Sequence, residues 1–109
     1  MKIKLAEGKD VVSESLEFYL VGLDQYEDFD LVIKVLEEKM EIKIYEKTDG
    51  IYSRIGKYKI DGLECKLIYH DDVGVYSFSM IQSVVVNQRL KKIFQDLVFL
   101  LNSGEINKK

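Results

Sequence analysis

The chain of 109 residues has no proline, no tryptophan, one cysteine and one histidine. A single cysteine, Cys65, cannot close a disulfide within the chain, which favours a reducing compartment. No apolar run approaches the roughly 20 residues that a helix needs to span a bilayer, and the charged N-terminus lacks the apolar region of a secretion signal. We therefore expect a cytoplasmic protein without a membrane partner, folded as a single domain over residues 1–109.

Charge is distributed unevenly along the chain, although the formal net charge is only −3. Acidic residues outnumber basic ones in the first fifty positions, and the excess is reversed in the remainder. An acidic half disfavours long-range attraction to nucleic acid and leaves attraction to a basic protein open. Because no catalytic or cofactor motif is recognisable, we expect a protein that is not an enzyme, with no cofactor, no metal and no nucleic-acid partner.

Residues 41–81 form the part of the sequence around which the rest is organised. Four short runs rich in Ile, Val, Tyr and Phe are separated by Asp49-Gly50, Asp61-Gly62 and Asp72-Val73-Gly74. Asp-Gly between such runs is a strong hairpin signal, because type I′ turns need positive φ angles that Gly and Asp tolerate. The pattern predicts an antiparallel meander with strands over 41–47, 51–60, 63–70 and 75–81.

The N-terminal segment is harder to assign. Residues 2–6 alternate in polarity and predict an edge strand, and residues 7–10 predict a turn. In residues 11–23, alternation of Leu16, Phe18 and Leu20 with more polar neighbours indicates a strand, whereas Val12, Leu16, Tyr19, Leu20 and Leu23 also fit one face of a helix. The β-branched and aromatic content favours the strand.

Two amphipathic helices flank the meander. The first is expected over 24–40, with Asp24 as its cap and Glu27 completing a capping box. The second is expected over 84–101, with Gly104 able to take the left-handed conformation that ends a helix. This order predicts an α+β fold in two layers: a mostly antiparallel sheet, formed by the meander and an N-terminal strand or hairpin, with both helices on one face.

Two places combine residues that could support chemistry. The only histidine, His70, is followed directly by two carboxylates, Asp71 and Asp72. A small metal-dependent enzyme that uses His70 and Asp72 is therefore an alternative function, and the least favoured one. Ordinary turn chemistry explains this run better. Cys65 shares a strand face with Leu63 and Leu67, which predicts a buried thiol and not a nucleophile.

The candidate binding surfaces combine carboxylates with aromatic residues. Carboxylates concentrate between residues 24 and 30, more densely than a helix cap requires, and Tyr and Arg share one parity of the strand over 51–60. Such residues are typical anchors of protein interfaces. Base stacking as in RNA-binding sheets is disfavoured, because the aromatic-glycine signature of those domains is missing. The predicted partner-binding residues are Asp24, Tyr26, Glu27, Asp28, Asp30, Tyr52, Arg54, Tyr58, Asp71 and Asp72.

In size, acidity and order of elements, the whole chain resembles the small immunity proteins of bacterial toxin systems, including contact-dependent inhibition. That resemblance implies a non-catalytic protein that binds a cognate toxin domain, often a nuclease, and blocks it. It has no diagnostic motif, so it assigns no residue. A homodimeric structural or regulatory module, paired through the open face of the sheet, is the principal alternative.

Overall fold

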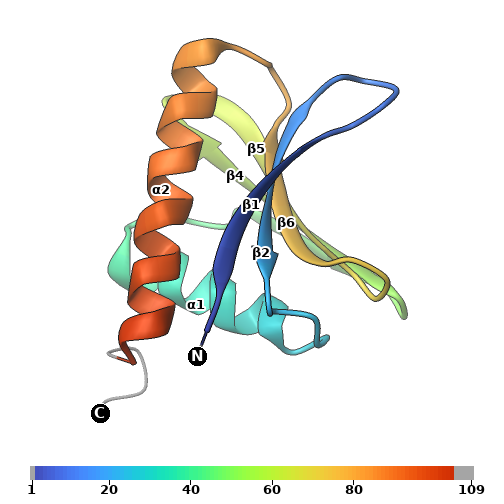
Figure 1. Ribbon diagram of the computed structural model, residues 1–109, viewed down its shortest axis with the longest axis vertical. Coiled ribbons are helices and arrows are strands. Elements are labelled where there is room, and N and C mark those ends of the chain that lie inside the picture. Colours follow the sequence, from blue (N-terminus) through green and yellow to red (C-terminus); the bar gives the residue numbers. More distant parts are fainter. Residues whose placement is uncertain (1, 105–109) are drawn as a thin grey trace.

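The computed structural model describes residues 2–104 as one six-stranded antiparallel sheet and two helices (Figure 1). The strand order is β1-β2-β6-β5-β4-β3, so the N-terminal hairpin pairs with the meander through β2 and β6. The α+β class is as predicted, with the hairpin adding two strands to the meander. The elements are β1 (Lys4–Lys9), β2 (Leu16–Val21), α1 (Asp28–Lys39), β3 (Glu46–Asp49), β4 (Ser53–Ile60), β5 (Leu63–His70), β6 (Gly74–Ser79) and α2 (Val84–Ser103).

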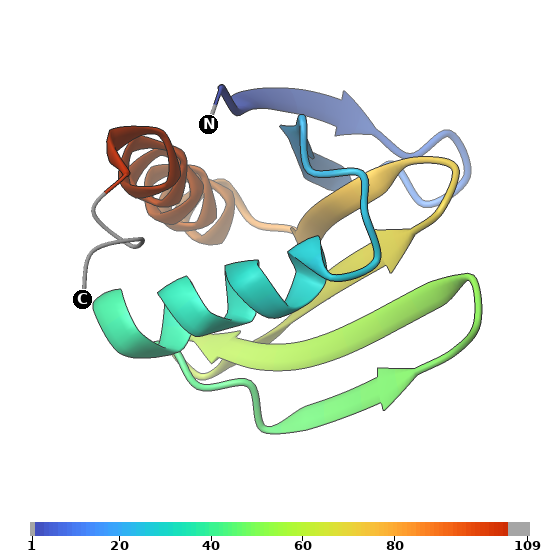
Figure 2. The same cartoon turned by 90° about the horizontal axis from the view of Figure 1, so that it is seen from below.

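Both helices lie on the same side of the sheet, which curves around them (Figure 2). Side chains alternate along the strands, so that every second residue of β4, β5 and β6 is buried beneath the helices. Each large side chain removed from water in this way contributes about 1.5–3 kcal/mol. The residues of this core that are least accessible and largest are Tyr58, Phe18, Phe29, Phe94, Leu20, Leu23, Leu36, Leu67, Leu90, Leu97, Leu101 and Val32.

The Asp-Gly turns behave largely as predicted. Asp61 and Gly62 have φ angles of +52° and +82° and join β4 to β5, as a type I′ turn requires. Gly74, with φ of +91°, closes the turn between β5 and β6. Gly50 lies in a longer connection and its N–H donates to the carbonyl of Ser53 at 2.8 Å.

Several predicted boundaries are wrong, and three of the differences have a clear physical cause. The first meander strand was expected over 41–47, but β3 begins at Glu46, because Glu41 turns the chain at φ of +58° and the following segment packs its isoleucines against the core. Residues 7–9 of the turn expected over 7–10 are the end of β1, and the chain turns after them. Gly8 lies within that strand because the ring of Tyr19 covers it: a Cβ there would lie 2.8 Å from the ring. The third difference is the position at which α1 begins.

α1 begins at Asp28, four residues later than predicted, and Asp24 does not cap it. The carbonyl of Tyr26, which in a longer helix would accept from the N–H of Asp30, accepts instead from the guanidinium of Arg54 at 3.0 Å. Leu23 is buried and its carbonyl accepts from Val75 at 3.1 Å, which holds the preceding bend against the sheet. These tertiary contacts replace the first predicted turn of helix.

The strand favoured for residues 11–23 is confirmed only in part. Residues 16–21 form β2, whereas residues 11–15 belong to the connection between β1 and β2. α2 begins after Ser83, whose hydroxyl oxygen accepts from Val86 N–H at 3.1 Å, and ends at Gly104 with φ of +79°. Over residues 2–104, neither helix combines the length and the apolar character needed to cross a membrane.

Glu41, directly after α1, supplies a stability test. Its left-handed conformation is one that glycine adopts more easily. We expect Glu41→Gly to raise the free energy of unfolding by about 0.5 kcal/mol, whereas Glu38→Gly inside the helix should lower it by about 1 kcal/mol. Urea unfolding followed by circular dichroism measures both changes. A loss of stability in Glu41→Gly would mean that the glutamate side chain makes contacts worth more than the backbone strain.

Candidate functional site

Arg54 of β4 joins three segments at one end of the molecule. Its side chain is only 4% exposed. Nη1 and Nη2 each bind one oxygen of Asp30 at 2.8 Å, and Nε binds Asp49 at 2.8 Å. The guanidinium also lies 4.5 Å from the ring centroid of Tyr26 and 4.8 Å from that of Phe29. Arg54 therefore fixes the start of α1 against the β3–β4 hairpin.

The electrostatics of this cluster follow from the bidentate geometry. The hydrogen bonds from Arg54 lower the pKa of Asp30 and of Asp49, and the same contacts raise the pKa of Arg54. Lys47 adds weaker ion pairs to both carboxylates, at 3.4 and 3.9 Å. Asp30 is thus committed to a structural ion pair, and the prediction that Arg54 anchors a partner is wrong, because the side chain is buried.

Tyr58, the other predicted sheet anchor, is also buried and therefore does not face a partner. Its hydroxyl donates to Ser77 Oγ, which in turn donates to the carbonyl of Lys66, both at 2.5 Å. Burial raises the pKa of Tyr58. Arg54 and Tyr58 lie on the same face of β4, as their even spacing predicted. That face is the one that the helices cover. Tyr52 lies outside β4, in the turn before it, and is exposed.

Most of the remaining predicted residues converge at this same end. The segment before α1 lies beside the tips of the β3–β4 and β5–β6 hairpins in both views (Figures 1 and 2). The hydroxyl of Tyr26 donates to the carbonyl of Gly50 at 3.0 Å, and the N–H of Asp71 donates to the carbonyl of Tyr52 at 3.0 Å. Segments that are far apart in sequence are therefore held together by backbone and ring contacts.

The phenol of Tyr69 shows how closely the carboxylates gather. Burial raises its pKa, and the negative charges of Asp71, Glu27, Asp24 and Asp28 raise it further. The Tyr69 ring meets that of Tyr26 edge to face, with centroids 5.7 Å apart. One tyrosine thus lies within electrostatic reach of acidic residues from two separate segments.

Five carboxylates at this end have no Lys or Arg partner within residues 2–104. Three exposed apolar side chains lie at the hairpin tips of the same end: Ile51 (83% exposed), Tyr52 (66%) and Val73 (52%). Neither Ile51 nor Val73 is among the binding residues predicted from the sequence, although an apolar residue at such a turn, where polar residues are usual, is a usable signal. We call this surface the acidic end: Asp24, Glu27, Asp28, Asp71 and Asp72, with Ile51, Tyr52 and Val73.

His70 lies beside two of these carboxylates. Its Nδ1 lies 3.3 Å from Asp71 and 3.9 Å from Asp72, and the three ligand-type atoms lie within 4.8 Å of one another. However, Nδ1 already accepts a hydrogen bond from the backbone N–H of Asp72 at 3.1 Å. Turn formation accounts for this geometry, as it does for the N–H of Val73, which donates to the carbonyl of His70 at 3.0 Å.

Cys65 is fully buried, as predicted, and faces the same way as Leu67. Burial raises the pKa of its thiol to about 11, which keeps it protonated at neutral pH. A protonated thiol enclosed by the core is not a nucleophile, so this side chain serves packing.

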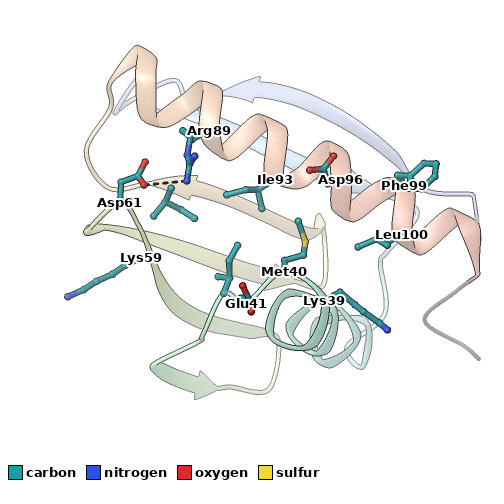
Figure 3. A pocket seen from close by; sticks show the side chains of 12 residues that line it. Lys39, Met40, Glu41, Lys59, Asp61, Arg89, Ile93, Asp96, Phe99 and Leu100 are labelled. Atoms are coloured by element: carbon teal, nitrogen blue, oxygen red, sulfur yellow. Dashed lines mark hydrogen bonds and ion pairs between the residues drawn. The ribbon is translucent and has the colours of Figure 1, made fainter. Parts of the chain in front are cut away.

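A groove of about 680 Å³ lies away from the acidic end, between the end of α1, the β4–β5 turn and α2 (Figure 3). Arg89 and Asp61 form an ion pair across it at 3.3 Å. Its charged lining has equal numbers of bases and acids, so it favours neither sign of ligand. The lining residues are Lys39, Lys59, Arg89, Glu41, Asp61 and Asp96 around Met40, Ile42, Ile60, Ile93, Phe99 and Leu100.

Within residues 2–104, the acidic end is therefore the surface that unites predicted site residues with exposed apolar groups and with carboxylates that have no Lys or Arg partner. Comparisons with protein families, with curated proteins and with solved structures find no match to this chain. The functional assignment consequently depends on the chemistry of this surface.

Proposed function

We propose that this chain is a non-catalytic binding protein whose acidic end binds a basic surface of another protein. The observation that supports this proposal is that five carboxylates without a Lys or Arg partner within residues 2–104 lie at the same end of the molecule as Ile51, Tyr52 and Val73. Apolar and aromatic groups with surrounding charge are the composition of a protein interface, in which a few anchors supply most of the affinity. A cytoplasmic location is part of the proposal.

The kind of partner follows from the charge. Carboxylates of one sign raise the association rate with a cationic partner and exclude anionic ones. Enzymes that act on nucleic acids have basic clefts, so an immunity or inhibitor protein that neutralises a nuclease toxin is the function that fits best. The carboxylates would occupy the positions of substrate phosphates, and Ile51 and Tyr52 would supply apolar contact.

Preorganisation is a further argument for this surface. Arg54 is buried and makes six polar and aromatic contacts that fix the start of α1 to the β3–β4 hairpin. The adjoining acidic segment is therefore held in place before any partner arrives. A fixed surface loses less conformational entropy on binding than a mobile one, which increases affinity.

Charge reversal at the acidic end tests this function. The candidate partner is the product of the gene next to the one that encodes this chain, taken as the cognate toxin. We expect Asp24→Lys/Asp72→Lys to weaken binding to it by at least about tenfold at low salt, since both carboxylates would face the partner. Isothermal titration calorimetry at two salt concentrations measures the effect. Both side chains are exposed and neither pairs with Lys or Arg within residues 2–104, so folding should be unaffected.

The matched control is Glu14→Lys/Glu38→Lys, which changes the net charge equally at exposed positions outside the acidic end. It should alter affinity by less than about threefold, through the long-range field alone. Equal losses in the two double variants would show that net charge, and not this surface, determines binding.

A further inference from the structure

The face of the sheet that the helices leave open carries a continuous aromatic stripe. Tyr19 of β2 stacks on Tyr76 of β6 with ring centroids 5.1 Å apart and an interplanar angle of 24°. Tyr76 in turn stacks on Phe78 with centroids 6.4 Å apart and an angle of 20°. All three side chains are only partly buried. The stripe therefore presents apolar surface that nothing within residues 2–104 covers completely.

Strand register places different partners on the two sides of β6. In one row across the sheet, Tyr76 lies between Tyr19 of β2 and Ile68 of β5. In the next row, Phe78 lies between an acid of β2 and a base of β5: Glu17 on one side and Lys66 on the other. These two rows form the centre of the open face.

Glu17 and Lys66, the two charged residues that flank Phe78, are half-buried and form no ion pair within residues 2–104. Within residues 2–104, Lys66 has no acidic partner, and Glu17 has no basic one, although it accepts a hydrogen bond of 2.5 Å from the hydroxyl of Tyr19. By contrast, the charges farther along the same row, Glu46 and Lys57, pair with each other at 3.3 Å. Partial burial of an unpaired charge is costly, so Glu17 and Lys66 are suited to partners from outside the chain.

We propose that the open face binds the same face of a second copy, with the two-fold axis parallel to β6. That rotation exchanges the positions of β2 and β5. Glu17 of each copy then faces Lys66 of the other, and Tyr19 faces Ile68, while the Phe78 rings meet at the axis. Every member of the two rows gains a complementary neighbour, as an isologous interface requires.

The charge pattern is the reason for choosing a second copy over a different protein. Glu17 and Lys66 lie at equal distances on either side of β6. After the two-fold rotation, the acid of one copy faces the base of the other, so the surface is complementary to itself. Face-to-face packing of two sheets with aligned strands is a common arrangement in which the inner side chains interdigitate. The central strands β2, β6 and β5 would make this contact, and the charged edge strands β1 and β3 would remain outside it.

The dimer would also have a functional consequence. A rotation about an axis parallel to β6 leaves the direction of that strand unchanged in both copies. The β5–β6 turn, which contains Asp71 and Asp72, would therefore lie at the same end of both copies. Two acidic ends on one side of the assembly could engage a partner with two basic sites, and avidity would increase the effective affinity.

Sedimentation equilibrium of the isolated chain tests the dimer. We expect the wild-type chain to dimerise at concentrations below about 1 mM, the range of weak homodimers. Glu17→Lys and Lys66→Glu each place like charges in contact, and each should raise the dissociation constant at least about tenfold. The combined variant Glu17→Lys/Lys66→Glu recreates both pairs and should return the constant to within about threefold of wild type.

The matched control is the exchange Lys92→Glu/Asp96→Lys, which reverses an exposed ion pair of α2 on the opposite side of the sheet and should leave dimerisation unchanged. A second readout is disulfide cross-linking of Phe78→Cys, which should form a covalent dimer under mild oxidation, whereas Ile55→Cys should not. A wild-type chain that stays monomeric at about 1 mM would overturn the proposal. So would a dimer that the single reversals do not weaken, or that the combined variant does not restore. None of these measurements involves the acidic end or its partner.

Discussion

Replacing Arg54 with methionine is expected to lower the free energy of unfolding by about 2–4 kcal/mol, among the larger effects for a single substitution. The change removes the bidentate pair to Asp30 and the bonds to Asp49 and to the carbonyl of Tyr26. It also leaves that carbonyl without its donor. Denaturant unfolding measures the loss, and methionine keeps most of the buried volume, so the change reports mainly on polar contacts.

The pH dependence of this effect separates charge from packing. Arg54 lowers the folded-state pKa of Asp30 and Asp49, so their stabilisation is present above the unfolded value of about 3.9 and is lost as pH falls through the folded values. The gap in stability between wild type and Arg54→Met should therefore narrow below about pH 4. Both carboxylates are about half exposed, and solvent screening therefore limits the electrostatic contribution to this difference in stability. A gap that stays constant down to pH 2 would assign the whole effect to packing.

Gly74→Ala is expected to be similarly damaging, with a loss of about 2–4 kcal/mol. Gly74 has φ of +91°, and a Cβ there would lie 2.6 Å from the carbonyl oxygen of Leu23. That oxygen is backbone and accepts a hydrogen bond from Val75 at 3.1 Å, so it cannot move without breaking the contact that holds the bend before α1. Thermal and denaturant unfolding both measure the change.

Gly62→Ala is the matched control for this prediction. Gly62 has a comparable φ of +82°, but nothing lies within 4 Å of the added Cβ. Gly62→Ala should lower the free energy of unfolding by only about 1 kcal/mol, the cost of placing alanine at a positive φ angle. If the two substitutions cost the same, the contact with Leu23 would contribute nothing, and the close approach at Gly74 would be irrelevant to stability.

The sequence predicts the local elements well where a short signal determines them. Asp61-Gly62 specifies its turn because the positive φ angles are a property of those two residues. The end of α2 at Gly104 follows from the same cause. The start of α1 could not be predicted, because the carbonyl of Tyr26 is bound by Arg54, a residue 28 positions away. A capping pattern is a local signal, and here a tertiary contact overrides it.

The candidate site was predictable in parts but not as a whole. The acidic segment before α1 and the pair Asp71-Asp72 were both recognised, yet only the fold brings them to one end. Parity on β4 predicted that Arg54 and Tyr58 share a face, but it could not indicate which face the helices cover. Burial of an arginine was the least predictable outcome, since it depends on carboxylates supplied by α1 and β3.

Chemical-shift mapping tests the central claim most directly. The ¹⁵N-labelled chain would be titrated with the product of the neighbouring gene and followed by amide spectra. Binding through the acidic end predicts shifts concentrated at residues 24–28, 51–52 and 71–73, with little change in the groove between α1 and α2. Shifts confined to that groove or to the aromatic stripe, or no binding at micromolar concentrations, would contradict the account.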